Sequence, residues 1–309
     1  MGLFTELSLD EAQRLARDYG VEIERLEALA AGSVNSNFCL TDVTGARYFA
    51  RVYEEQGAAG AGAELRLLGE LGRLGVPVVA PRLLGDGRAV SIHQGKPFAL
   101  YPWVEGDIVC QAGVTEAHAA AVGEALARLH LATPHVTPLE GGRFRVEDLR
   151  LRLDRIEAES PEHRDAALHI RRRLDHYQTR RNAEVPSGIV HGDLFRDNVL
   201  FQGGRIVALI DFESASHGPL AFDLMVTILA WCYGDSFDPA LVRALLSAYV
   251  KLRPLERGEK AALLVEGALA CLRFATTRIT DFSMRATPGT KALRDYRRFL
   301  ARLEALEQG

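Results

Sequence analysis

Three polar side chains near the middle of the chain have types and spacing that could perform phosphoryl transfer. Asp193 and Asn198 stand five positions apart in the stretch HGDLFRDNVLF, residues 191–201, and Asp211 follows the apolar run IVALI. Phosphoryl transfer needs a carboxylate for the attacking hydroxyl, oxygen ligands for Mg²⁺ and groups that hold a triphosphate. A strand, a polar loop, a second strand and an acid would bring these three side chains to one end of a hairpin, where Mg²⁺ finds the hard oxygen ligands it prefers.

The same spacing occurs in the kinase signature H-R-D-L-x-x-x-N followed by D-F-G. Here His191-Gly192-Asp193 opens the pattern, Asn198 keeps the offset, and Asp211-Phe212-Glu213 closes it. Residues of these types also form turns and cap strands, but that interpretation does not account for all three offsets together. Asp197 has no place in the signature and is interpreted as a turn residue.

HGDLFRDNVLF together with LIDFESASHGPLAFDL resembles the aminoglycoside phosphotransferase and choline kinase superfamily, which has a protein-kinase-like fold. Within it, the chain is similar to the bacterial homoserine kinases, which carry an R-F-x-x-x-R-x-x-D segment, here residues 273–281. The opening LFTELSLDEAQRLARDYGV is similar too, so the resemblance covers nearly the whole chain. It implies that Asp193 is the catalytic base and that Asn198 and Asp211 are catalytic residues that bind Mg²⁺. Glu213 replaces the glycine of D-F-G, either as a further Mg²⁺ ligand or as a surface acid. Asp223, in AFDL, is expected to support the loop or cap a helix.

The resemblance places the phosphate-binding loop at AAGSVNSNFCL, where Ser33, Asn35 and Asn37 can donate to phosphate oxygens of ATP. Arg51, in YFARVYE, stands where the superfamily usually has a lysine. Arginine keeps the positive charge and adds a bidentate fork, so phosphate binding is expected to survive. A solvent-exposed strand arginine is the alternative.

Two further features belong to the expected nucleotide site. Glu64, in the helix after Arg51, is the expected ion-pair partner of that arginine, with Glu70 as the alternative. FALYPWVEGD fits a hinge between two lobes, where Tyr101 and Trp103 would lie near adenine. Either aromatic could instead be a core residue.

The acceptor side is indicated by arginines. Homoserine carries an ammonium group, a carboxylate and the hydroxyl that would be phosphorylated, and arginine binds carboxylates well. Arg196 could hold the substrate carboxylate or the transferring phosphoryl group, and Arg273 lies in the family segment. Arg278 and Asp281 would share a helix face and either bind the amino acid or form a surface ion pair. A choline or aminoglycoside site would instead favour acids and aromatic rings for a cationic acceptor.

The elements that must position these residues divide the chain in two. Residues 1–104 are rich in strands, at SNFCLTDV, ARYFARVYE, RAVSIHQ and KPFALYPWV, with helices after the Ser8–Glu11 capping box and at 60–74. Residues 105–309 are mainly helical, at 115–131, 146–182 and 219–305, with short strands near 189–191, 199–201 and 206–211. We therefore expect an α+β, protein-kinase-like fold: a small β-rich nucleotide-binding lobe, and a larger helical lobe for catalysis and acceptor binding.

Composition narrows the class of protein. The chain has 309 residues, 48% of them hydrophobic, and a net charge of −4, which argues against a nucleic-acid partner. No secretory signal or membrane span is evident, so a cytoplasmic protein is expected, as a monomer or a homodimer. The four cysteines form no C-x-x-C pair and are expected to be reduced core residues.

These features together predict a kinase that uses ATP and Mg²⁺. The resemblance implies that it phosphorylates the side-chain hydroxyl of L-homoserine, a step of threonine biosynthesis. The alternative is the same chemistry on choline, ethanolamine, an aminoglycoside or another small alcohol. A nucleotide-binding pseudokinase is disfavoured because Asp193, Asn198 and Asp211 are all present.

Overall fold

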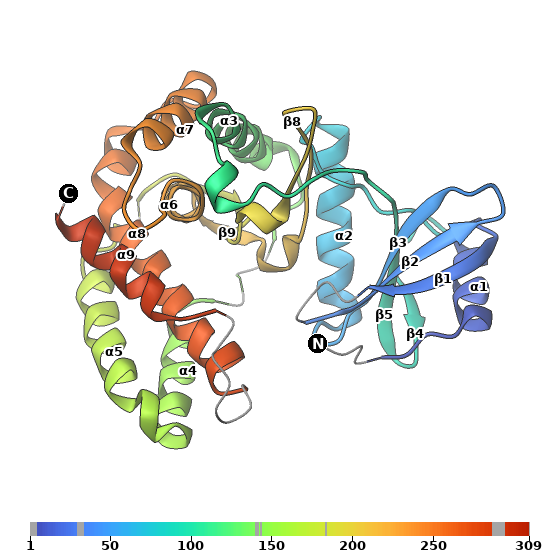
Figure 1. Cartoon of the computed structure of the whole chain (residues 1–309), viewed down its shortest axis with the longest axis horizontal. Helices are drawn as coiled ribbons and strands as arrows, with labels where there is room; N and C mark the ends of the chain where they lie inside the picture. The colour runs from blue at the N-terminus through green and yellow to red at the C-terminus, as the bar shows by residue number, and fades with distance from the viewer. Residues whose placement is uncertain are drawn as a thin grey trace.

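The computed structural model describes residues 5–29, 34–139, 142, 144–182, 184–285 and 294–308. The expected division into a small β-rich part and a larger helical part is confirmed (Figure 1). The small lobe is one antiparallel sheet with strand order β1-β2-β3-β5-β4, and it carries two helices. Its elements are α1 (Leu9–Asp18), β1 (Ile23–Leu29), β2 (Ser36–Asp42), β3 (Arg47–Val52), α2 (Ala58–Arg73), β4 (Ser91–His93) and β5 (Lys96–Pro102).

The large lobe surrounds two short antiparallel strand pairs, β6-β9 and β7-β8, with helices. The β7-β8 pair is the predicted hairpin, and β6-β9 joins segments on either side of it. The elements are α3 (Glu116–Ala132), α4 (Val146–Glu159), α5 (Arg164–Gln178), β6 (Ser187–Val190), β7 (Val199–Gln202), β8 (Arg205–Leu209), β9 (Ser216–Pro219), α6 (Leu220–Trp231), α7 (Pro239–Leu252), α8 (Arg257–Arg278), a π-helical turn (Ile279–Ser283) and α9 (Arg297–Gln308).

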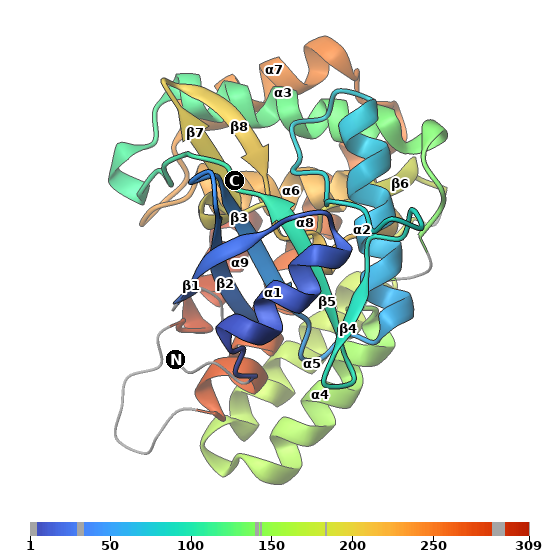
Figure 2. The same cartoon turned by 90° about the vertical axis from the view of Figure 1, so that its right-hand side faces the viewer.

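Local sequence explains how the small lobe begins. Ser8 caps α1 by accepting a hydrogen bond from the Glu11 backbone, and the Glu11 carboxylate accepts one from the Ser8 backbone, as the capping box predicts. The helix packs on the outer face of the sheet, away from the large lobe (Figures 1 and 2). Strand register then fixes part of the site, because Asn37 on β2 lies directly opposite Arg51 on β3.

One of the hydrophobic clusters spans both lobes. Leu65, Leu68 and Leu71 on α2 belong to the same buried cluster as residues of α3, α6 and α7. The chain crosses between the lobes after β5, where Asp107 pairs with Phe201 on β7. A Cβ atom at Gly106 would approach the Leu200 side chain to 2.8 Å, so only glycine allows this contact. The β7–β8 hairpin is therefore packed against the segment that connects the lobes, and Leu209 at its end pairs with Val78 of the small lobe.

Two strands and one break in a helix were not predicted from the sequence. β1 and β9 were not expected, and the helical segment 146–182 is two helices separated by a short 3-10 turn at Pro161–His163. β9 has the sequence Ser-His-Gly-Pro, which lacks the β-branched and aromatic residues that signal a strand. It is a strand because Val190 and Ile189 of β6 pair with it.

We predict that Gly123→Ala lowers the free energy of unfolding by about 2 kcal/mol, an overpacking cost. Helices α3 and α7 pack so closely that a Cβ atom at Gly123 would lie 2.2 Å from the Leu245 carbonyl oxygen. Gly69→Ala on α2 is the matched control, because nothing lies within 4 Å of its added Cβ, and alanine there should stabilise by up to about 1 kcal/mol. Urea unfolding of both variants tests the contact; equal effects would contradict it.

Candidate active site

The loop between β6 and β7 carries Asp193 and Asn198 and is closed by its own hydrogen bonds. The Asn198 side-chain amide donates to the Asp193 backbone oxygen at 2.8 Å and lies 3.4 Å from its carboxylate. The Ile210 backbone N–H donates to the Asn198 carbonyl at 3.0 Å, which holds the end of β8 beside the loop. Asp193, Asn198 and Asp211 therefore lie at the same end of the hairpin, as the spacing predicted.

His191 links the two strands that carry these acids. Its Nδ1 accepts from the Asp193 backbone N–H at 3.3 Å, and its Nε2 lies 3.0 Å from the Ile210 carbonyl oxygen. This arrangement requires a neutral ring with the proton on Nε2. Burial agrees with it, because it lowers the pKa of this fully enclosed imidazole. His191 therefore acts as a neutral tie between the catalytic loop and the residue before Asp211.

Asp223, at the start of α6, supports the loop from beneath. Its carboxylate accepts the backbone N–H groups of His191 at 2.7 Å and Gly192 at 2.8 Å, and it lies 3.2 Å from His130 Nε2. Burial would raise the pKa of this carboxyl, but the hydrogen bond and charge of His130 and the hydrogen bond from Gly192 together lower it. The expected supporting role is thus confirmed by the geometry.

Asp211 is held in an unusual backbone conformation. Its φ of 65° lies in the left-handed region that is sparsely populated by residues other than glycine. Such strain persists where the surrounding structure enforces it, and it is concentrated at functional sites. The strained residue directs the chain from β8 into the 3-10 turn Phe212–Ser214, which also carries Glu213.

Arg51 lies against the two acids of this turn. Its Nη1 atom is 2.9 Å from a Glu213 carboxylate oxygen and 3.5 Å from Asp211, and its Nε donates to Asn37 at 3.2 Å. Burial would lower the pKa of this guanidinium, but Asp211 and Glu213 outweigh it and raise the pKa further. Asn35 donates to Glu213 as well. Arg51, Asn35 and Asn37 of the small lobe thus meet the acids of the large lobe.

The expected Arg51–Glu64 ion pair is not formed. Glu64 is buried below Tyr53, whose hydroxyl lies 3.4 Å from one carboxylate oxygen, and its other oxygen lacks a hydrogen-bond partner. Burial raises the pKa of Glu64 to about 8 despite the nearby charge of Arg51. The alternative, Glu70, accepts from Thr137 instead. Arg51 instead pairs with Asp211 and Glu213, because their carboxylates lie opposite its guanidinium on the large lobe.

The aromatic residues expected near adenine have other contacts. Tyr101 is buried, and its hydroxyl lies 2.9 Å from that of Tyr53, so it is part of the core between the lobes. Trp103 lies under the guanidinium of Arg47, 4.6 Å from the ring centroid. Trp103 directly follows β5, where the chain passes from the small lobe to the large lobe. Ser33, expected in the phosphate loop, lies outside the described residues.

Arg273 on α8 reaches the catalytic loop from the opposite side. Its Nη1 donates to the Gly192 carbonyl at 2.7 Å and lies 3.7 Å from the Asp193 carboxylate. The guanidinium carbon lies 4.1 Å from the Phe144 ring centroid and 4.0 Å from that of Phe274. These contacts fix a buried cation beside the proposed base.

A cavity of about 140 Å³ opens beside this arginine, between the loop, β9 and helices α4, α5 and α8. That volume is well below the range of drug-sized pockets and suits a small ligand. Its lining includes Phe144, Arg145, Ser214, His217 and Arg273. Only Arg273 was singled out from the sequence. The other four carry no local signal, because they come from segments far apart in the sequence, just before α4 and in the stretch from the 3-10 turn into β9.

Two of the expected acceptor-binding residues have structural partners. Arg196 donates to the Ala230 carbonyl near the end of α6, where a cation is favourable. Asp281 pairs with Arg152 on α4 at 2.6 Å instead of with Arg278. The predicted spacing of three residues assumes a regular α-helix, but the chain is π-helical from Ile279 to Ser283, so Arg278 and Asp281 do not share a face. Arg278 itself is half-buried and donates to the Asp295 carbonyl.

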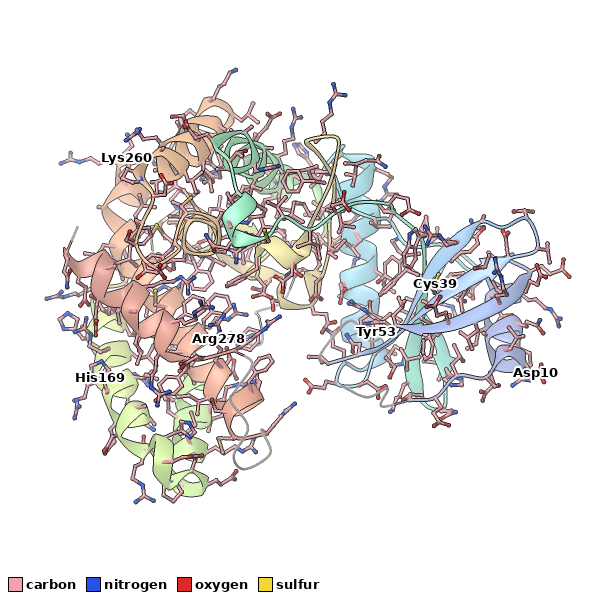
Figure 3. The ribbon with its side chains drawn as sticks, viewed as in Figure 1. Asp10, Cys39, Tyr53, His169, Lys260 and Arg278 are labelled. Carbon is pink, nitrogen blue, oxygen red and sulfur yellow. The ribbon has the colours of Figure 1, made fainter. Side chains whose placement is uncertain are left out.

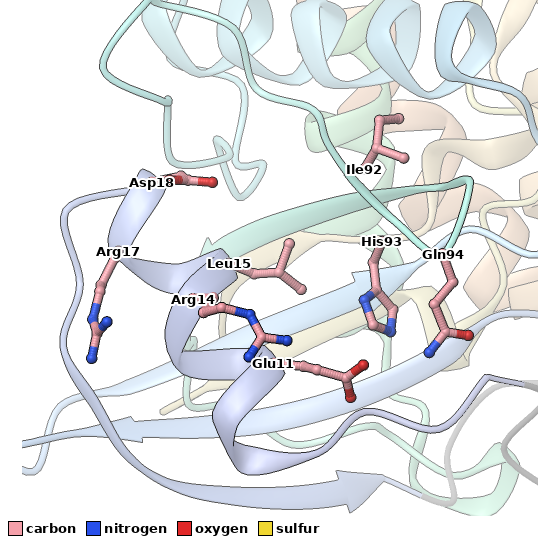
Figure 4. Close-up of a pocket in the computed structure, with 8 residues that line it drawn as sticks. All are labelled: Glu11, Arg14, Leu15, Arg17, Asp18, Ile92, His93 and Gln94. Carbon is pink, nitrogen blue, oxygen red and sulfur yellow. The ribbon is translucent and has the colours of Figure 1, made fainter.

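A second hollow lies on the outer side of the small lobe, between α1 and the β4–β5 turn (Figure 4). Polar side chains such as Glu11, Arg14 and Gln94 line it, and it is remote from the catalytic loop. Within the described ranges, no cluster of three His, Cys, Asp or Glu residues could hold a metal ion. No helix among those residues is long and apolar enough to cross a membrane.

The chain is similar to known proteins in sequence and in fold. Residues 25–255 match the model of the phosphotransferase enzyme family. The homoserine kinase of Nitrobacter winogradskyi is 34% identical, over 91% of this chain and 87% of its own length. That of Methylobacillus flagellatus is 33% identical, over 91% of this chain and 88% of its own. An amicoumacin kinase solved with AMP-PNP and Ca²⁺ shares the fold, with a TM-score of 0.73 and 18% identity, covering 97% of this chain and 92% of its own.

Proposed function

The chain belongs to the phosphotransferase enzyme family and groups with its homoserine kinases, and on that premise we propose that it transfers the γ-phosphoryl group of ATP to the side-chain hydroxyl of L-homoserine. The observation that carries the proposal is the meeting of Asp193, Asn198 and Asp211 at one end of the β7–β8 hairpin. The curated relatives of similar length support homoserine as the acceptor.

Asp193 is the proposed base. Its carboxylate would orient the hydroxyl of homoserine and accept its proton as the oxygen attacks the γ-phosphorus and the bond to ADP breaks. Arg273, 3.7 Å away, holds the carboxylate in place and also anchors the Gly192 carbonyl of the loop. His191 and Asp223 keep the loop backbone in this position.

Asn198, Asp211 and Glu213 fit a Mg²⁺ ion by the chemistry of their donor atoms. Two carboxylates and an amide oxygen are hard ligands, and the Asn198 amide nitrogen already donates to Asp193, which leaves its oxygen as the metal-binding atom. The Arg51 guanidinium lies against both acids, in agreement with a position that favours positive charge. A bound Mg²⁺ would neutralise the charge of the transferring phosphate. Arg51, Asn35 and Asn37 are proposed to contact the phosphates of ATP, because they lie beside these acids on the small lobe.

The test of the proposed function is ADP release with Mg-ATP and a panel of acceptors: L-homoserine, L-serine, choline, ethanolamine and kanamycin. A kcat/KM for homoserine of about 10⁴ M⁻¹s⁻¹ or more, well above the others, is expected for an ordinary enzyme on its own substrate. Turnover with another alcohol and none with homoserine would overturn the acceptor and leave the phosphotransferase assignment intact.

We predict that kcat/KM for homoserine falls as pH drops. Burial, together with the negative charges of Asp211 and Asp197, raises the pKa of Asp193 to about 7, although Arg273 acts in the opposite direction. The base must be ionised, so activity is lost below its pKa. Mg²⁺ at Asp211 would offset one of the raising charges, so the acid limb should lie at or below pH 7. A pH profile at saturating Mg-ATP tests this; a limb well above pH 7 would contradict it.

A further inference from the structure

Arg278 is a partly enclosed cation without an acidic partner among the residues the structure describes. Its guanidinium carbon lies 4.4 Å from the Phe299 ring centroid, and Nη1 donates to the Asp295 carbonyl at 3.0 Å. No carboxylate of the described chain lies within ion-pair distance of it. An enclosed guanidinium without a counter-ion is costly, so the site favours an anion.

The charges around Arg278 make the binding of an anion there still more favourable. Burial, together with the charges of Arg302, Arg294 and Arg298, lowers the pKa of Arg278 to about 10. Asp193 is the acid that acts in the opposite direction. Four arginines from α8, α9 and the segment before α9 thus form a positive cluster close to the proposed base.

Several other arginines of the large lobe form ion pairs. Arg181 pairs with Glu266 at 2.8 Å, Arg253 with Glu259 at 2.8 Å, and Arg152 with Asp281 at 2.6 Å. Within the cluster, Arg294 alone has a described acidic partner, Asp197 of the catalytic loop at 3.0 Å. Arg278, Arg298 and Arg302 therefore carry positive charge that no acid of the described residues neutralises by an ion pair.

The position of the cluster suits an amino acid whose hydroxyl reaches Asp193. Figure 3 shows Arg278 on the side of the large lobe that faces the small lobe. Homoserine carries its carboxylate and its hydroxyl at opposite ends of a four-carbon chain, so a cation a short distance beyond the base can bind one end while the base engages the other. The cavity beside Arg273 lies on the α4 side of the loop, and the cluster lies on the α9 side.

We propose, on the basis of the proposed function, that Arg278 binds the carboxylate of the acceptor, with Arg294 and Arg298 supplying further positive charge, while Asp193 engages the hydroxyl. Arg278 is then the residue that makes the enzyme select an amino acid over an amino alcohol. Its planar fork, held against Phe299, can donate two parallel hydrogen bonds to a carboxylate.

The test compares L-homoserine with 3-aminopropan-1-ol, which is homoserine with the carboxylate replaced by hydrogen. Arg278→Gln should lower kcat/KM for homoserine about 100-fold, mainly by raising KM, because a charged hydrogen-bonded contact is lost. The same variant should change kcat/KM for 3-aminopropan-1-ol less than about 3-fold, because that acceptor never makes the contact. The KM for ATP should stay unchanged. Parallel losses for both acceptors, or no loss for homoserine, would overturn the proposal.

Two controls separate binding from folding. Arg155→Gln removes an exposed arginine of α4 that pairs with Glu159, and it should leave both activities unchanged. Arg278→Gln should unfold no earlier than the wild type in urea, because it removes an uncompensated charge. If it does not fold, Arg278→Lys replaces it and should still raise the homoserine KM about 10-fold by loss of the fork.

The outcome also distinguishes this proposal from the proposed function. A wild-type protein that phosphorylates homoserine while Arg278→Gln keeps the same preference for it over 3-aminopropan-1-ol would overturn the role of Arg278 alone. A wild-type protein that does not phosphorylate homoserine would overturn both.

Discussion

Asp193→Asn is expected to lower kcat with homoserine by about 10³-fold, the typical contribution of a general base. The amide keeps the shape of the side chain but cannot accept the proton of the hydroxyl. Binding of an ATP analogue should persist, because Asp193 is not among the residues expected to hold the nucleotide. Those residues belong to the small lobe, with Asp211 and Asn198 as the expected Mg²⁺ ligands. ADP release and calorimetry measure the two effects. Asp154→Asn, an exposed acid paired with Arg171, is the matched control and should retain full activity.

Asp193→Asn should not lower the free energy of unfolding at alkaline pH. The pKa of Asp193 is raised in the folded protein to about 7 from an ordinary value of 3.8. A group with a raised pKa contributes stability below its ordinary value and loses that contribution as pH rises through the raised one. At about pH 8 the wild type therefore encloses an ionised carboxylate, and asparagine should increase the free energy of unfolding by about 2 kcal/mol. The gain should shrink toward about pH 5. Retained turnover, or a lower stability at pH 8, would contradict the assignment of this base.

The parts of the site that the sequence predicted are local. Asp193, Asn198 and Asp211 lie within one strand-loop-strand unit, so their spacing alone brings them together. The two-lobed fold was predicted for a similar reason, because strand-rich and helix-rich segments occupy separate stretches of the chain.

The parts that the sequence did not predict depend on contacts between distant segments. Arg51 pairs with Glu213, 162 positions away in the sequence, whereas the nearer Glu64 is buried beside the Tyr53 hydroxyl. The predicted pairing of Arg278 with Asp281 was wrong for a local reason, because π-helical geometry changes which residues share a helix face. A change of helix type of this kind has no reliable signal in the residue pattern.

Asp223→Asn is expected to reduce the free energy of unfolding by about 3 kcal/mol at pH 7, the typical loss when a buried charged hydrogen-bond acceptor is removed. The carboxylate accepts two backbone N–H groups with different oxygens, and an amide has only one oxygen, so either His191 or Gly192 loses its acceptor. Urea unfolding measures the loss; Asp154→Asn on the surface should cost less than about 1 kcal/mol. A difference of less than about 1 kcal/mol between these two variants would show that Asp223 does not hold the loop.

The kinetic effect of Asp223→Asn separates a positioning residue from a catalytic one. Asp223 is fully enclosed and does not reach the reacting atoms, so its loss should lower kcat about 10-fold by loosening the backbone that carries Asp193. The acid limb of the pH profile should remain, because the base itself is still present. Asp193→Asn thus loses rate without losing stability, whereas Asp223→Asn loses stability first and rate as a consequence. These opposite effects on rate and stability are expected only if one residue, Asp223, positions the loop and another, Asp193, accepts the proton.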